Sequence, residues 1–163
     1  MNKVYLAAQY GRKDELRVYR DMFQDRGYVV TSRWLDETGK DGNNALRDHS
    51  VADKNRAFHA DRDENDVSDS DYFVEFTEEP YGHKYPGTGG RHYESGYAKM
   101  LGLRLFIVGW RENIFHDLPC FTYCANLTEL FEHFPPVKKI TEIKQVVSDY
   151  IAHQDSGATG IDD

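Results

Sequence analysis

Short apolar runs alternate with segments of helical periodicity along the chain. Continuous apolar runs such as residues 3–8 and 103–109 are typical of strands buried on both faces of a parallel sheet. The pattern predicts strands at residues 3–8, 28–34, 72–76, 103–109 and 121–124. Strands that alternate with helices indicate an α/β fold.

Between these runs, apolar residues recur at the spacing of one helix face. The pattern predicts helices at residues 14–26, 45–63, 126–133 and 140–153, and a further helix directly after the glycine-rich loop 86–90. Gly27 is expected to end the first helix, and Asn126 is expected to cap the fourth. We therefore expect one Rossmann-like (flavodoxin-like) domain over residues 1–153, with about five parallel strands, helices on both faces and a flexible tail at 154–163. Ligands of such folds bind beyond the carboxyl ends of the strands.

Composition narrows the possible partners. The chain has 163 residues, a formal net charge of -8 and a pI near 5.3, which disfavours a nucleic-acid polymer as ligand. The N-terminus turns polar too early for a signal peptide, and no apolar run is long enough to predict a membrane span. Cys120 and Cys124 are expected to be reduced, as in a cytoplasmic protein.

The glycine-rich loop is the strongest local signal. Gly87, Gly89 and Gly90 allow the backbone to approach a ligand closely, and the free N–H groups of the following helix favour an anion. Glu94 is expected in the first helical turn, where the helix dipole would keep it ionised and suited to be a nucleophile or a ribose-hydroxyl acceptor. The alternative is a glycine turn before a surface helix. No G-x-G-x-x-G motif follows the first strand, so no dinucleotide cofactor is expected.

Other polar clusters have simpler interpretations. The acidic run 61–71 predicts a solvated helix end, which would account for Asp61, Glu64, Asp66 and Asp69. The histidines at 83, 92 and 116 are irregularly spaced, so no metal site is predicted. Three aromatic residues are candidates either to stack a base or to pack in the core: Trp34, Tyr81 and Tyr85.

Three segments together resemble the nucleoside 2-deoxyribosyltransferase family, which includes nucleotide N-glycoside hydrolases. They are Val4–Ala8, the acid-spaced segment 63–71, and Gly89–Ala98 with its E-x-G-Y-A element. The resemblance spans roughly residues 3 to 134, including 111–119.

The resemblance implies a role for each matching residue. Glu94 matches the nucleophile that attacks the anomeric carbon, Asp63 matches the acid that serves the leaving base, and Tyr5 matches the tyrosine that orients the nucleophile. The substrate is expected to contact the two loops around them, at Ala8, Gln9, Gly87, Thr88, Gly89, Gly90 and Arg91. Cleavage of a C1′–N bond needs both a carboxylate at the sugar and a proton donor at the base, as in retaining glycosidases. The resemblance also implies a homo-oligomer.

The choice between hydrolysis and base exchange rests on one loop position. The family's transferases carry an acid six residues before the nucleophile, and Thr88 stands there in this chain. A hydroxyl beside glycine N–H groups, with Arg91 nearby, favours a nucleoside 5′-monophosphate substrate and hydrolysis. Base exchange on a deoxynucleoside, a non-catalytic nucleotide sensor and related cleavage of another N-glycoside remain alternatives.

Overall fold

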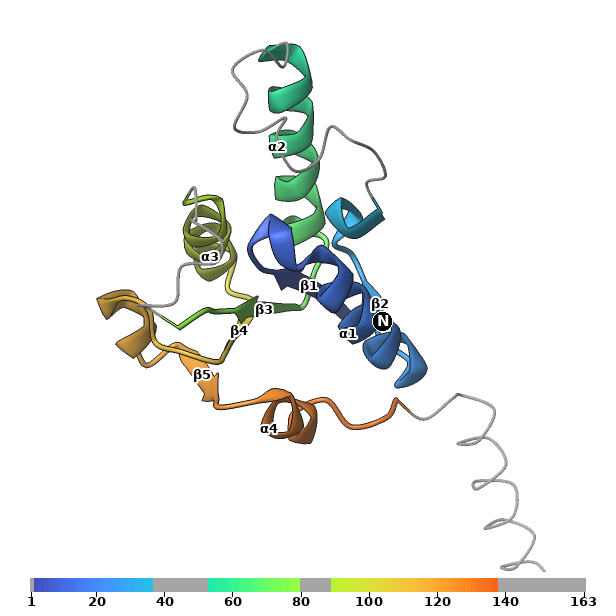
Figure 1. The fold of residues 1–163 in the computed structure, drawn as a ribbon, viewed down its shortest axis with the longest axis vertical. Coiled ribbons are helices and arrows are strands. Elements are labelled where there is room, and N and C mark those ends of the chain that lie inside the picture. The colour runs from blue at the N-terminus through green and yellow to red at the C-terminus, as the bar shows by residue number, and fades with distance from the viewer. Residues whose placement is uncertain (1, 37–52, 80–88, 138–163) are drawn as a thin grey trace, which may run out of the picture.

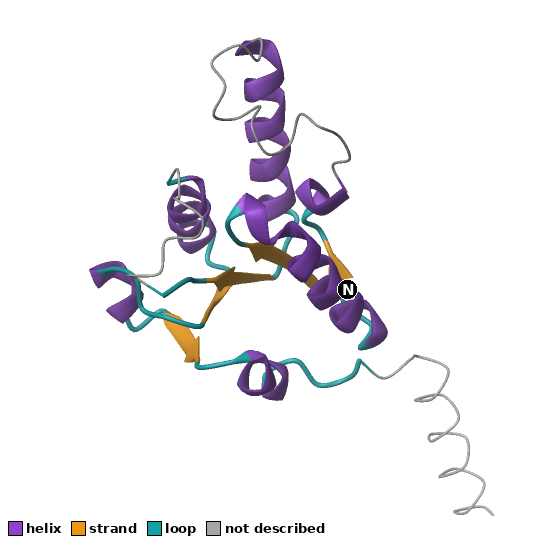
Figure 2. Ribbon diagram, in the orientation of Figure 1, coloured by secondary structure: helices purple, strands orange, loops and turns teal. Residues whose placement is uncertain are grey.

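The protein was analysed as a computed structural model, which describes residues 2–36, 53–79 and 89–137. Its centre is a five-stranded, all-parallel sheet with strand order β2-β1-β3-β4-β5 (Figures 1 and 2). The strands are β1 (Lys3–Ala7), β2 (Val29–Val30), β3 (Tyr72–Phe76), β4 (Arg104–Val108) and β5 (Phe121–Cys124). The expected α/β fold with a parallel sheet is therefore confirmed.

Four α-helices belong to the described part of the chain: α1 (Lys13–Asp25), α2 (Asp53–Ser68), α3 (Gly90–Met100) and α4 (Leu127–Glu132). Helices α2 and α3 lie side by side on one side of the sheet, and α4 lies on the other (Figure 1). The described ranges also contain three 3-10 turns: η1 (Tyr10–Arg12), η2 (Arg33–Asp36) and η3 (Ile114–Asp117).

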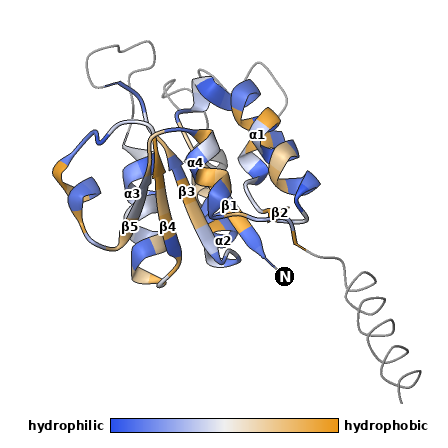
Figure 3. Ribbon diagram, turned by 90° about the horizontal axis from the view of Figure 1, so that it is seen from below, coloured by the Kyte–Doolittle hydropathy of each residue, from blue (hydrophilic) through white to orange (hydrophobic). Residues whose placement is uncertain are grey.

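The inner strands β1, β3 and β4 are mostly apolar and buried, although each carries one charged residue (Figure 3). Below the sheet an aromatic cluster joins α1 to the chain after α4. Phe23 packs edge-on against Phe134 with ring centroids 5.0 Å apart, and Tyr28 lies 5.3 Å from the same ring. These contacts close the lower layer and leave the carboxyl ends of the strands for the loops and for α2 and α3.

The second strand is shorter than predicted. It pairs with β1 only through Val29 and Val30, although a strand was expected over residues 28–34. Beyond it, the Ser32 hydroxyl accepts a hydrogen bond from the Leu6 N–H at 2.6 Å. The Ser32 side chain thus takes the place of a backbone hydrogen bond between the strands, and the chain then continues into η2.

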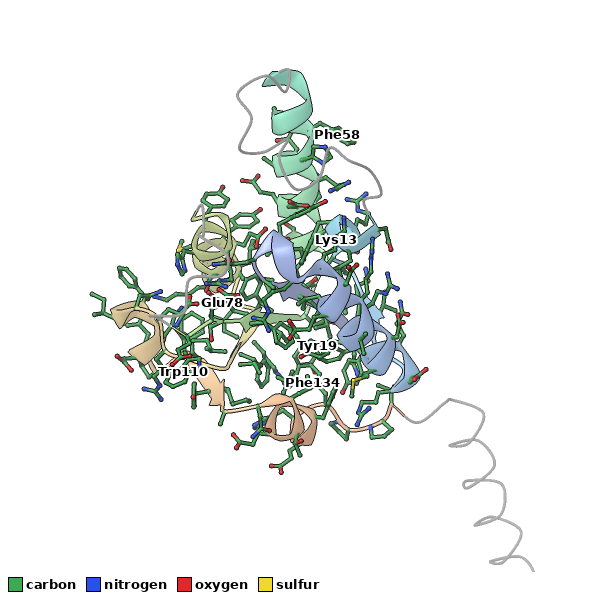
Figure 4. All side chains as sticks on the ribbon, viewed as in Figure 1. Lys13, Tyr19, Phe58, Glu78, Trp110 and Phe134 are labelled. Atoms are coloured by element: carbon green, nitrogen blue, oxygen red, sulfur yellow. The ribbon has the colours of Figure 1, made fainter. Side chains whose placement is uncertain are left out.

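Helix α2 ends later than predicted. It continues to Ser68, five residues past the expected end, so most of the acidic run is helical. Its first half projects beyond the sheet, and the Phe58 side chain there is 62% exposed (Figure 4). The start expected at residue 45, the helix at 140–153 and the tail at 154–163 fall outside the described residues, so these stay predictions.

Two expected helix ends are confirmed. Gly27 follows α1 with φ 86°, a left-handed conformation that favours glycine. The Asn126 side chain accepts a hydrogen bond from the Glu129 N–H at 3.0 Å and so caps α4. Within the described ranges, no helix combines the length and the apolar character needed to cross a bilayer.

Candidate active site

Tyr5 and Glu94 form the centre of the candidate site. Tyr5 lies in the middle of β1 with no exposed surface, and its ring stacks on Phe73 with centroids 5.7 Å apart. Its hydroxyl donates a hydrogen bond to Oε1 of Glu94 at 2.9 Å. Burial raises the pKa of Tyr5 well above its usual value, and the nearby acids add to this shift. Tyr5 therefore stays a protonated phenol and a hydrogen-bond donor.

Glu94 does not lie where the sequence suggested. Helix α3 begins at Gly90, and its first turn carries no acid. Glu94 therefore sits in the second turn, and the stabilising field of the helix end fades within the first turn. The expectation of a first-turn acid was wrong.

The ionisation state expected for Glu94 was wrong as well. Burial raises the pKa of Glu94 to about 8, against the lowering effect of the Tyr5 hydrogen bond. That value includes the charges of Asp63 and Glu75, which raise the pKa, and the charge of Arg91, which lowers it. Glu94 is therefore mostly protonated at neutral pH in the unliganded protein.

Asp63 reaches the same place from α2, which packs against α3. Its side chain is 26% exposed, and one carboxylate oxygen lies 3.6 Å from the guanidinium of Arg62. Its charge raises the pKa of both Tyr5 and Glu94. The structure thus brings together the three predicted catalytic residues from β1, α2 and α3, while the role of each remains a prediction.

Asp66, one turn further along α2, corrects another expectation. It was expected to be solvated but is 4% exposed. Its carboxylate accepts hydrogen bonds from the backbone N–H of Arg33 at 2.9 Å and from Nε of the same residue at 2.6 Å. The extension of α2 turns this residue inward, where it ties the helix to η2. Asp61 and Asp69 are exposed as expected, whereas Glu64 is half-buried and accepts a hydrogen bond from the Tyr93 hydroxyl.

The chain after β1 offers a polar group to a ligand. Ala8 and Gln9 are half-buried, and the backbone oxygen of Gln9 accepts a hydrogen bond from the Arg12 N–H at 2.9 Å. The side-chain Oε1 of Gln9 is buried and has no hydrogen-bond partner in the described part of the chain. A buried acceptor without a donor costs free energy, so this oxygen suits a ligand N–H or O–H.

Trp34 packs in the core beside β1. It is 7% exposed, and its indole N–H donates to the backbone oxygen of Leu6 at 3.0 Å. Trp34 is thus a core residue, which is the packing alternative that the sequence left open. Four other candidates fall in the undescribed segment 80–88: Tyr81, Tyr85, Gly87 and Thr88.

The two described glycines of the loop, Gly89 and Gly90, differ in backbone conformation. Gly89 precedes α3 with φ 85°, which a residue with a side chain rarely adopts. Gly90 is the first residue of the helix. An added Cβ at either position would meet no atom of the described residues within 4 Å, so the glycine at 89 is explained by its backbone conformation.

Arg91 is surrounded by carboxylates rather than open to a ligand. Its Nε lies 3.0 Å from Glu75, its Nη1 lies 2.8 Å from Glu78, and its Nη2 contacts Glu112. Nη1 also donates to the backbone oxygen of Phe76 at 3.0 Å. Figure 4 shows Glu78 beside this part of the site. The expected contact of Arg91 with a phosphate stays a prediction, and it would require exchange of these partners.

Sequence reasoning missed this carboxylate network. Its one visible signal was a charged residue, Glu75, inside the apolar run 72–76. The partners of Arg91 come from two chain segments, around β3 and after β4, which only the fold brings together.

One group of side chains has the composition of a metal site. Ligand atoms of Glu75, His92 and His116 all lie within 4.8 Å of one another. However, the Arg91 guanidinium lies 3.0 Å from the same Glu75 oxygen that the two rings approach. The backbone N–H of Glu112 also donates to Nδ1 of His116 at 3.2 Å, and Nε2 of the same ring lies 3.1 Å from Nδ2 of Asn113. These contacts favour an ion-pair network over a bound cation.

The architecture defines the class first: a parallel α/β domain in which two acids from α2 and α3 and a tyrosine from β1 lie together. Solved structures share this fold. The 2-deoxyribosyltransferase of Bacillus psychrosaccharolyticus aligns with a TM-score of 0.60 at 16% identity, over 85% of this chain and 99% of its own. CMP N-glycosidase BcmB of Clostridium botulinum aligns with a TM-score of 0.50 at 15% identity, over 81% of this chain and 97% of its own.

These similarities confirm the fold that the sequence resemblance implied. No protein-family model and no curated protein sequence matches the chain. Any activity therefore has to be argued from the site.

Proposed function

We propose that this protein cleaves the N-glycosidic bond of a deoxynucleoside or of a nucleoside 5′-monophosphate through a glycosyl ester on Glu94. The observation that carries the proposal is the hydrogen bond from buried Tyr5 to Glu94, with the charge of Asp63 acting on both. This arrangement provides a carboxylate, a group that orients it and a second acid. The two solved neighbours, named as a 2-deoxyribosyltransferase and a CMP N-glycosidase, support the same class of reaction.

The two acids divide the chemistry between them. With the pKa of Glu94 near 8, only about a tenth of Glu94 is ionised at pH 7 in the unliganded protein. The reactive form has Glu94 ionised and the proton on Asp63.

In the first step, a Glu94 oxygen bonds to C1′ of the sugar while the C1′–N bond breaks. The electron pair of that bond stays on the base, which takes the proton from Asp63. Tyr5 holds Glu94 in position through its hydrogen bond. In the second step, water or another base attacks C1′, Asp63 accepts the proton of the attacking group, and Glu94 leaves as a carboxylate.

Hydrolysis is the favoured second step, because Thr88 replaces the acid that transferases of the resembling family carry six residues before the nucleophile. Base exchange is the second candidate, and the fold similarity to a 2-deoxyribosyltransferase supports it. A nucleotide sensor that binds without turnover is the non-enzymatic alternative.

One experiment separates these candidates. The protein is incubated with a panel of nucleosides and their 5′-monophosphates, with and without a second free base, and the products are separated by chromatography. Free base and free sugar indicate hydrolysis, whereas a new nucleoside indicates exchange. The proposal predicts that Glu94→Ala abolishes both products, and that exposed Asp61→Asn, as a control, retains them. A wild-type protein that binds members of the panel without releasing base would refute the enzymatic proposal.

A further inference from the structure

Glu75 is a charged residue at the centre of the sheet. It lies in β3 with no exposed surface, and one carboxylate oxygen lies 3.0 Å from Nε of Arg91. Burial by itself raises the pKa of Glu75, but contacts with His116 and His92 and the charge of Arg91 lower it to about 2. A fully buried carboxylate that stays ionised has a large desolvation cost, so its partners must offset that cost.

One partner of Glu75, Arg91, links it to the candidate nucleophile. Arg91 lies on α3 one turn before Glu94, and its side chain is 9% exposed. It also contacts Glu78, which follows β3, and Glu112, which follows β4. Arg91 therefore fixes the start of α3 to the carboxyl ends of two neighbouring strands.

We propose that Glu75 is a positioning residue for the cleavage reaction: through Arg91 it holds α3 so that Glu94 meets Tyr5, and its buried charge opposes a second negative charge on Glu94. This inference rests on the proposed function. Glu75 does not touch the substrate in this account. It acts through Arg91 and through the field at Glu94.

Charged and titratable groups face Glu94 from every element around it. Tyr5 on β1 donates the hydrogen bond, Asp63 on α2 and Glu75 on β3 add negative charge, and Arg91 on α3 adds positive charge. Among these, Glu75 is fully buried, so solvent screens its charge least. Removal of the Glu75 charge should therefore lower the pKa of Glu94.

The test compares Glu75→Gln with Glu112→Gln. Both substitutions remove a carboxylate from Arg91, but Glu112 is not among the groups that shift the pKa of Glu94. The titration midpoint of Glu94 is followed by carboxyl-carbon NMR without substrate, and the pH profile of kcat/KM is measured in parallel. Glu75→Gln is expected to lower both midpoints by about one pH unit, whereas Glu112→Gln leaves them within a few tenths.

A second variant, at Arg91, separates the electrostatic effect on Glu94 from the positioning of α3. It also keeps the proposal testable if Glu75→Gln does not fold. Arg91→Lys keeps a positive charge near Glu94 but loses the planar fork that spans three carboxylates. We expect kcat to fall about tenfold while the NMR midpoint of Glu94 stays in place. A variant with unchanged kcat would overturn the positioning role.

The results also distinguish this inference from the proposed function. If the wild type releases no base but Glu75→Gln lowers the NMR midpoint of Glu94, the proposed function fails and the electrostatic part of the inference stands. If base release is confirmed but the midpoints in Glu75→Gln match those of the wild type, the inference fails alone.

Discussion

The hydroxyl of Tyr5 lies 2.9 Å from Oε1 of Glu94, although 89 positions separate the two residues in the sequence. The bond joins a fully buried strand residue to the second turn of a helix. It fixes one carboxylate oxygen while Asp63 approaches from a second helix. Substitutions of Glu94, Asp63, Tyr5 and Gln9 test the site around this hydrogen bond. A substitution of Asp66 tests how α2 is attached to η2.

Glu94→Gln should make the protein more stable relative to the wild type as the pH rises. The pKa of Glu94 is raised from 4.5 to about 8 in the folded protein, so its stabilising contribution is complete below about pH 4.5 and is lost as the pH rises through 8. Glutamine has no such loss. Thermal unfolding of both proteins between pH 5 and 9 should show a melting-temperature difference that grows across this window, and a constant difference would contradict the raised pKa.

Asp63→Asn should slow the release of an ordinary base by about 10²–10⁴-fold, because the base then leaves without its proton. A nucleoside with an N7-methylated purine loses its base in neutral form and needs no proton from Asp63. Its release should fall much less, and this contrast is the measurement. Asp61→Asn, on the same helix but exposed, is the matched control. Equal losses for both substrates would show that Asp63 does not act as the acid.

Tyr5→Phe should raise the pH at which the enzyme becomes active. The hydrogen bond from Tyr5 lowers the pKa of Glu94, so its loss leaves the protonated acid more favoured. The ascending limb of the kcat/KM profile should move to higher pH, and the rate near neutral pH should fall by about tenfold or more. The phenyl ring keeps its stack on Phe73, so we expect a change in unfolding free energy of about 1 kcal/mol. A limb that moves to lower pH would contradict this role.

Gln9→Ala tests the unpaired amide oxygen after β1. If Oε1 of Gln9 accepts a hydrogen bond from the substrate, its loss should raise KM several-fold with little change in kcat. Because the oxygen has no partner among the described residues, folding stability should not fall. Parallel kinetics and thermal unfolding check both statements. A lower melting temperature with unchanged KM would point to a structural role instead.

Asp66→Ala should destabilise the fold without a direct effect on the chemistry. The substitution leaves the Arg33 backbone N–H and side chain without their acceptor. It also removes the contact that joins α2 to η2. Because the Arg33 side chain is 57% exposed, water compensates in part, and we expect a loss of about 1–3 kcal/mol of unfolding free energy. Denaturant unfolding measures this loss. Full stability in the variant would show that the pair contributes little.

The sequence by itself determined most of the fold, because local patterns decide the type of each element. Largely apolar runs such as residues 72–76 predict buried strands, and the capping position of Asn126 predicts the start of α4; both were confirmed. Motif spacing also singled out Tyr5, Asp63 and Glu94, which the fold brings together. The ends of β2 and α2 were predicted wrongly from the sequence. The end of β2 depends on the hydrogen bond between the Ser32 side chain and the backbone of Leu6, and the end of α2 depends on the burial of Asp66.

Only the tertiary structure decided the charge state of the site. The ionisation of Glu94 depends on burial and on Asp63, Glu75 and Arg91, which three different elements contribute. No local pattern reports the distance between such groups, and Coulomb energies depend on that distance and on the exclusion of water. The sequence therefore identified the acid, whereas the packing of α2 and α3 around β1 and β3 raised its pKa.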